Sequence, residues 1–209
     1  LNEALQKMDT RTSREQRNQL AYEAGKLGIT GTDAVLQFVQ ASDKINIALG
    51  DVLGDGAMVT VGKLTDVYKN ATEQLQGVSL EEQMLKIGDA LNELGKSSTA
   101  NEGYIVDFTA RLAGVANQAG LSAADIMGFA SALDQDMQKV EMSATALQTF
   151  ITQIYKKPAE FAKIAGKDIK DFSNLLKTDM NEALLLVLGN MNVENVIADL
   201  VPQFAELSL

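Results

Sequence analysis

The sequence of 209 residues contains no histidine, no cysteine and no tryptophan. Most nucleophilic and acid–base sites need His or Cys, and so do most zinc, copper and haem sites. The missing cysteines also exclude disulfides, so the fold must depend on its core and on helix packing. Only carboxylates, Lys, Tyr, Ser and Thr remain for catalysis. We therefore predict a protein that is not an enzyme, with no catalytic, cofactor-binding or metal-binding residue.

Proline and aromatic residues are also scarce. The chain has only Pro158 and Pro202, and aromatic side chains make up 5% of it. Few prolines and aromatics, with much Ala, Leu, Gln, Glu and Lys, favour helices over sheets. We predict an all-α fold, a multi-helix bundle of about eight to eleven short amphipathic helices.

The charge balance argues against nucleic acid as a partner. The formal net charge is −10, with 28 acidic and 18 basic residues. A nucleic-acid-binding protein usually carries a basic excess or stripe. The basic clusters here are short, Arg11, Arg14 and Arg17, then Lys156 and Lys157, and solvated helix faces explain them. We expect no nucleic-acid contact from this segment.

No segment is suited to crossing a membrane. The longest apolar run, Ala183 to Leu188, is far shorter than the ~20 residues that span a bilayer, and no secretory signal is visible. We therefore expect no membrane contact. The chain opens with Leu1 instead of Met and stops at Leu209 inside an apolar phrase. We expect it to be a region of a longer protein, cut at both ends.

The clearest helix is predicted to begin after Ser79. Ser79 and Glu82 have the spacing of a capping box, Glu82 and Lys86 form an i,i+4 pair, and Gly95 is the expected stop. An apolar stripe at helical spacing lies between them and consists of Leu80, Met84, Ile87, Leu91 and Leu94.

The same patterns predict further helices along the chain. Capping-type pairs open helices at Thr12 and Glu15, at Thr30 and Asp33, and at Ser122 and Asp125, and Ser143 starts another. The remaining helices are expected at 57–76, 99–119, 168–177 and 179–188. Pro158 breaks a helix or starts the next one, and Gly166 and Gly189 mark later stops. One helix is expected to carry on one face Val35, Phe38, Ser42, Ile45 and Leu49. The helix that opens at Ser122 is expected to carry Ile126, Met137 and Val140. Further expected buried positions include Phe108, Leu112 and Ile151.

A possible duplication divides the chain into two helical halves, 1–98 and 99–209. A shift of 92 residues places Leu20, Ala21, Ala24, Gly28 and Asp33 on Leu112, Ala113, Ala116, Gly120 and Asp125. Each copy has the order helix, glycine stop, capping residue, helix. Common helix–turn–helix patterns produce the same match without shared ancestry, so both explanations stay open.

Three other groups have a functional and a structural interpretation. The neighbouring carboxylates Asp134 and Asp136, or Glu81 and Glu82, would need a cleft to act as a hydrolase pair, and helix solvation explains them better. The glycine-rich segment 49–56 lacks a Walker lysine and calcium-ligand spacing, so a plain loop is favoured. The eight methionines suggest an adaptable binding surface, although several lie on the apolar stripes expected in the core.

Three segments of the sequence stand out as recognisable phrases. They are residues 21–50, AYEAGKLGITGTDAVLQFVQASDKINIALG, residues 119–154, AGLSAADIMGFASALDQDMQKVEMSATALQTFITQI, and residues 157–188, KPAEFAKIAGKDIKDFSNLLKTDMNEALLLVL. Together they resemble the conserved core of phage tail tape-measure proteins. The three segments occur in the same order as in the family and cover about half of the chain. Family members are usually much longer, with membrane-active segments that have no counterpart here, and their core offers no catalytic motif to transfer.

The resemblance implies a structural role in tail assembly and length determination. It places the protein in the lumen of the tail tube in the virion, and in the host cytoplasm during assembly. It implies tail tube subunits, tail-tip proteins and assembly chaperones as partners, and a homo-oligomer remains an alternative. Because glycines and caps divide the segment, we expect a folded or anchoring part instead of an extended ruler. The rival interpretations are a helical scaffold or adaptor of a bacterial surface or secretion system, and a carboxylate-based hydrolase.

Overall fold

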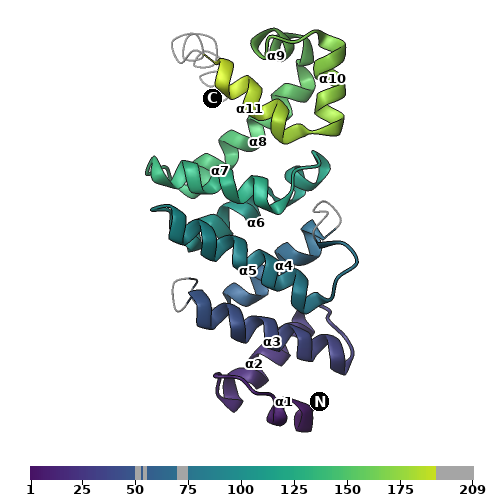
Figure 1. The fold of residues 1–209 in the computed structure, drawn as a ribbon, viewed down its shortest axis with the longest axis vertical. Helices are drawn as coiled ribbons and strands as arrows, with labels where there is room; N and C mark the ends of the chain where they lie inside the picture. The colour runs from purple at the N-terminus through teal and green to yellow at the C-terminus, as the bar shows by residue number, and fades with distance from the viewer. Residues whose placement is uncertain (50–52, 54–55, 70–74, 192–209) are drawn as a thin grey trace, which may run out of the picture. The chain divides into compact units, whose positions relative to one another are not determined.

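The computed structural model describes residues 1–49, 53, 56–69 and 75–191, and the regular elements in these ranges are α-helices (Figure 1). The all-α prediction is confirmed, and the eleven helices of the described residues fall within the predicted number. The helices are α1 (Asn2–Lys7), α2 (Arg14–Lys26), α3 (Thr32–Leu49), α4 (Ala57–Tyr68), α5 (Leu80–Ser97), α6 (Glu102–Gln118), α7 (Ala123–Gln135), α8 (Val140–Lys156), α9 (Pro158–Ile164), α10 (Ile169–Thr178) and α11 (Met180–Asn190).

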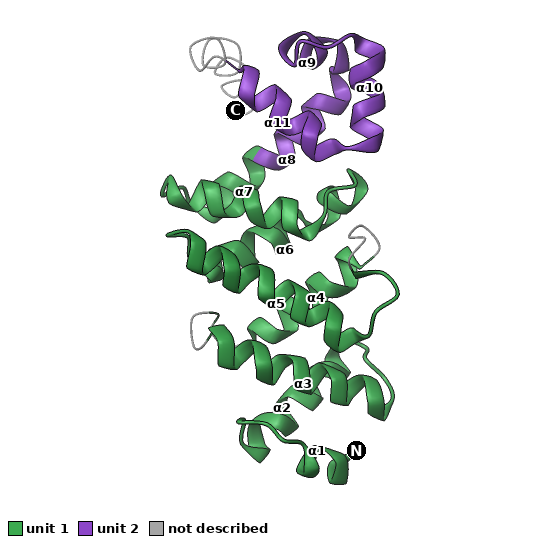
Figure 2. Cartoon of the chain, in the orientation of Figure 1, with its two compact units in different colours: residues 1–146 green, residues 147–209 purple. Residues whose placement is uncertain are grey.

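The chain forms two compact units, residues 1–146 and residues 147–209, and the boundary falls within α8 (Figure 2). The sequence-based division at 98/99 lies inside the first unit. Helices from both predicted halves meet there, because α4 packs on α6 and α5 packs on α7. The hydroxyl of Tyr68 in α4 donates a hydrogen bond to the carbonyl of Thr109 in α6, at 3.4 Å. Whether the two sequence halves share ancestry stays a prediction.

Unit 1 consists mainly of three helix pairs, α2–α3, α4–α5 and α6–α7, stacked in chain order (Figure 1). Within each pair the two helices pack against each other. Between pairs, the first helices contact one another (α2 with α4, α4 with α6), and so do the second helices (α3 with α5, α5 with α7). Two layers of helices stacked in this way are the arrangement of α-solenoids.

The apolar stripes predicted from sequence form the layer between the helices. On α3, all five predicted positions, Val35, Phe38, Ser42, Ile45 and Leu49, are buried. On α5, Met84, Ile87 and Leu91 are buried as well. Two helical glycines let neighbouring pairs approach closely. A Cβ at Gly88 of α5 would lie 2.7 Å from Cγ1 of Ile45, and one at Gly62 of α4 would lie 2.7 Å from Cδ1 of Leu27.

A glycine with left-handed φ precedes the second helix of a pair, or its equivalent, four times. At Gly28, Gly120 and Gly166 the turn also has the same backbone bond to the end of the preceding helix. Four glycines with left-handed φ, Gly28, Gly77, Gly120 and Gly166, are followed by α3, α5, α7 and α10. They are 49, 43 and 46 residues apart. After three of them, a capping side chain two residues on accepts a hydrogen bond from the next helix, namely Ser79, Ser122 and Asp168.

The backbone bonds of this turn explain its glycine. The amide of Ile29 donates to the carbonyl of Ala24 at 3.0 Å, and that of Leu121 donates to Ala116 at 2.9 Å. These six-residue bonds close the helix end in the Schellman form, which places the residue before the donor in the left-handed region that favours glycine. The alignment shifted by 92 residues therefore superimposes two turns of the same geometry.

Several predicted helix ends differ in the structure. The cap of α2 is Ser13 with Gln16, in a reciprocal capping box, and not Thr12 with Glu15. Helix α3 begins at Thr32, two residues after the predicted Thr30. Helix α8 begins at Val140, before the predicted Ser143. Helix α4 ends at Tyr68, whereas 57–76 was predicted. The predicted loop at 49–56 lies largely outside the described residues.

Two glycines predicted to stop helices lie inside them. Gly95 belongs to α5, which continues to Ser97 and ends at Ser98, whose hydroxyl donates to the carbonyl of Leu94 at 2.6 Å. The side chain of Glu102 occupies the space that a Cβ at Gly95 would need, so this glycine serves packing and not termination. Gly189 likewise lies within α11.

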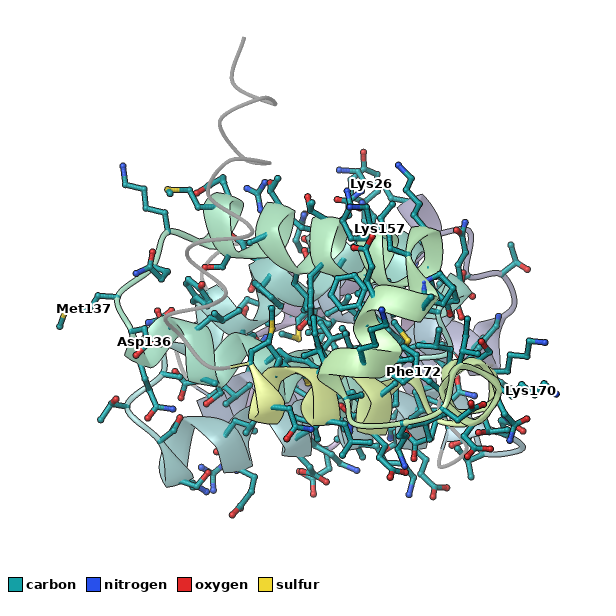
Figure 3. All side chains as sticks on the ribbon, turned by 90° about the horizontal axis from the view of Figure 1, so that it is seen from above. Lys26, Asp136, Met137, Lys157, Lys170 and Phe172 are labelled. Carbon is teal, nitrogen blue, oxygen red and sulfur yellow. The ribbon has the colours of Figure 1, made fainter. Side chains whose placement is uncertain are left out.

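The predicted helix from Ser122 through Met137 to Val140 is interrupted. Helix α7 ends at Gln135, and Met137 has a left-handed φ of 57°, with its amide donating to the carbonyl of Asp134 at 2.8 Å. Met137 was expected in the core, but it is 93% exposed and points away from the ribbon (Figure 3). A non-glycine residue in this conformation gives no signal in the sequence.

In unit 2, α9, α10 and α11 pack against one another. Pro158 occupies the first turn of α9, as predicted, where its missing amide hydrogen costs no hydrogen bond. The rings of Phe150 and Phe161 meet edge to face at 5.8 Å. Phe172 is fully buried. The two short helices predicted at 168–177 and 179–188 correspond to α10 and α11 within two residues at each end.

Candidate interaction surfaces

The carboxylates that sequence analysis considered for hydrolysis take part in structural contacts. The carboxylate of Asp134 accepts a hydrogen bond from the amide of Asn101 at 2.7 Å, which ties the start of α6 to α7. Glu81 forms an ion pair with Lys44 at 2.6 Å, joining α5 to α3, and Glu82 pairs with Lys86 at 3.5 Å. These contacts agree with the structural interpretation of these side chains.

The described residues contain no group of three or more carboxylates that could hold a metal ion. A pocket of about 230 Å³ lies between α1 and α2 and is lined by Leu1, Asn2, Leu5, Gln6, Arg14, Asn18 and Ala21. This lining includes no carboxylate, so the pocket has no pair of groups for acid–base chemistry.

The shifted pKa values do not converge on one place. The backbone amide of Glu15 and the Ser13 hydroxyl lower the pKa of the Glu15 carboxyl at the start of α2. Burial raises the pKa of the Tyr68 hydroxyl in the core of unit 1, and burial also raises that of Tyr155 in α8. Catalytic sites bring groups with displaced pKa values together, whereas these three have separate, local causes.

The basic residues are engaged in part with the protein itself. Arg17 donates from Nη1 to the carbonyl of Met8 at 3.0 Å, and Lys157 pairs with Glu160 at 3.5 Å. Lys26 lies over the ring of the exposed Tyr22, 4.6 Å from its centroid. These local partners favour the interpretation of solvated helix faces.

Exposed apolar side chains are the features that suggest partners. Of the methionines, Met84 is buried on its predicted stripe, and Met58, Met127 and Met180 are buried as well. Met137 and Met142 are 93% and 62% exposed, although Met137 was expected on a stripe. On α11, Leu185 and Leu188 are 53% and 44% exposed. This last surface was not predicted from the sequence, although the unbroken apolar run from Ala183 to Leu188 is a signal for it.

Among the described residues, no helix is both long and apolar enough to traverse a lipid bilayer. The principal structural feature is therefore a set of stacked helix faces, with exposed apolar groups at α11 and at the α7–α8 turn.

Comparison with protein families relates this chain to proteins of phage tails. The family model described as phage-related minor tail protein matches residues 2–196, nearly the whole chain. Neither the curated proteins nor the solved structures gave a match. The description of the matching family names tail proteins, and the match indicates no enzymatic family. The resemblance drawn from three segments of the sequence is confirmed at the level of the family, and the chain belongs to the phage-related minor tail protein family.

Proposed function

We propose that this chain is part of a tape-measure protein, which sets the length of a phage tail inside the tail tube. The observation that supports the proposal most directly is the family match over residues 2–196. The fold supports it, because the described residues offer helix faces for contact and do not bring candidate catalytic groups together. In this role its partners would be tail tube subunits, tail-tip proteins and assembly chaperones.

The compactness of the fold supports one part of that role over the other. An α-helix advances about 1.5 Å per residue, so a continuous helix of 209 residues would measure about 310 Å. Packed helices lie only 8–10 Å apart, so a stacked pair of some 46 residues advances about 10 Å. While it is folded, the stack α2–α7 therefore spans much less length per residue than a continuous helix would. We infer that the segment acts as a folded anchoring or assembly part of the tape measure.

Deletion of the segment from the phage gene tests the proposal. The reading frame of residues 1–209 is removed, and tail length is measured by electron microscopy. An anchoring role predicts that tails fail to form, or that they keep their length. Tails shortened by about 310 Å would show that the segment is part of the ruler itself. Normal tail assembly in the complete absence of the parent protein would contradict the tape-measure role altogether.

A narrower deletion supplies the matched control. Removing 57–97, the whole pair α4–α5, takes out one layer of the stack and leaves the pairs α2–α3 and α6–α7. A ruler would lose about 60 Å of tail, since this range holds 41 residues. A folded anchor would leave the length unchanged.

The rival role as a general helical adaptor makes a different prediction. An adaptor of the cell surface would fractionate with the envelope of the host, whereas a tail protein copurifies with assembled virions. Immunodetection in purified tails and in envelope fractions separates the two.

A further inference from the structure

Helix α11 is apolar on two sides. Met180, Ala183, Leu184 and Val187 are buried and form the side that packs on α9 and α10. Leu185 and Leu188, one turn apart, lie on a different side and are about half exposed. A helix with apolar residues around most of its circumference is normally covered on both sides. The exposed side of α11 therefore calls for a further element.

The order of packing along the chain indicates what this element is. In each earlier case the first helix of a pair packs against the helix that follows it, as in α2–α3, α4–α5, α6–α7 and α9–α10. Helix α11 is next in this alternation. Within the described part of the chain its principal contacts are with α9 and α10, both of which precede it. The place of the following helix is not taken by a described element.

The sequence after α11 has the matching pattern. Val193, Val196, Ile197 and Leu200 are spaced i, i+3, i+4 and i+7, which is the spacing of one apolar helix face. Glu194 and Asp199 fall between them. These residues lie outside the described part of the structure, and the family match extends to residue 196.

We propose that the outer side of α11, formed by Leu185 and Leu188, is the docking surface for the apolar positions of residues 193–200 of the same chain. A segment tethered a few residues away is present at millimolar effective concentration, so a small apolar contact suffices to hold it. A second copy of the chain would need about 500 Å² of contact on each partner, and two half-exposed leucines supply only a small part of that area. The proposal does not depend on the role of the chain in the tail.

Cysteine pairs test this placement cleanly, because the natural sequence has no cysteine. Leu188→Cys is combined in the full chain with Ile197→Cys, and in parallel with Val193→Cys or Val196→Cys. The matched controls combine Leu188→Cys with Glu194→Cys or with Asp199→Cys. Oxidation is followed on non-reducing gels, where an internal disulfide shifts the mobility of the monomer. We expect faster internal cross-linking at the apolar positions than at the polar ones.

Two results would overturn the proposal. Equal rates at apolar and polar positions would mean that the segment does not dock by this face. Disulfide-linked dimers that form in preference to internal cross-links would assign the surface to a second copy.

A substitution gives an independent readout. Leu188→Gln should lower the urea midpoint of the full chain, because a covered leucine loses its contacts, whereas Asn190→Gln at the exposed helix end should leave it unchanged. An unchanged midpoint for Leu188→Gln would also count against the proposal, since an uncovered leucine has few contacts to lose.

Discussion

Gly88 provides the sharpest test of how the helix pairs stack. It lies in the middle of α5, where a Cβ would be 2.7 Å from Cγ1 and 3.1 Å from Cδ1 of Ile45 in α3. Ile45 is 2% exposed, and its branched side chain is stiff at χ1, so Cγ1 cannot swing away from the contact. Gly88→Ala must therefore displace α5 or α3.

Two opposing effects determine the size of the change. Extra atoms in a packed core cost about 1–3 kcal/mol, whereas alanine in place of glycine favours the helix by about 1 kcal/mol. The expected net effect is a destabilisation of about 1 kcal/mol. Gly25→Ala in α2 is the matched control, because no heavy atom lies within 4 Å of its Cβ position. The control should gain roughly 0.5–1 kcal/mol, so the two variants should differ by about 1–3 kcal/mol.

The assay is urea unfolding followed by circular dichroism, with the slope checked for constancy so that midpoints report stability. A third variant isolates the contact. In an Ile45→Ala background the obstructing atoms are gone, and Gly88→Ala should become stabilising, as at Gly25. If Gly88→Ala alone stabilises the protein as much as Gly25→Ala, α5 and α3 do not approach as closely as the structure shows, and the reasoning is refuted.

Three further predictions concern the turns and the core. Gly120→Ala should cost about 1–2 kcal/mol because φ is 74°, while Gly120→Asn should cost less, as urea midpoints would show. Ser122→Ala should cost about 1 kcal/mol by removing the cap that accepts the Asp125 amide at 3.1 Å, and an unchanged midpoint would contradict that role. The raised pKa of Tyr68 means that only the unfolded state ionises just above pH ~10, so stability should fall as pH rises beyond that value. Tyr68→Phe should weaken this alkaline dependence, and equal slopes for both proteins would exclude Tyr68 as its source.

Features with a local cause could be predicted from the sequence. The caps at Ser79 and Ser122 depend on a side chain and an amide three residues away, and both form as expected. The stripe on α3 is buried as predicted because helical spacing alone places its members on one side. The shift of 92 residues aligns the glycine turns at Gly28 and Gly120, because both have the same local sequence pattern.

Features that depend on contacts between residues far apart in the sequence could not be predicted from it. Gly95 looks like a stop, but its role depends on the side chain of Glu102 in the next helix. The order in which helices stack is set by contacts between pairs, and periodicity does not specify which stripe meets which. In α11, every position from Ala183 to Leu188 is apolar, so no pattern separates the buried Leu184 from the exposed Leu185. Met137 adopts a conformation that its residue type disfavours.

The stacking of unit 1 has a mechanical consequence. Among the described residues, the principal contacts of each helix pair are between its own two helices and with the adjacent pairs, and none of these principal contacts joins pairs that are distant in the stack. A force that pulls on one end would detach pairs in sequence, and each pair of about 46 residues would release up to ~150 Å of extended chain at 3.3 Å or so per residue. A protein built in this way would lengthen in discrete steps under force, because each helix pair is compact while it is packed and extended once it unfolds.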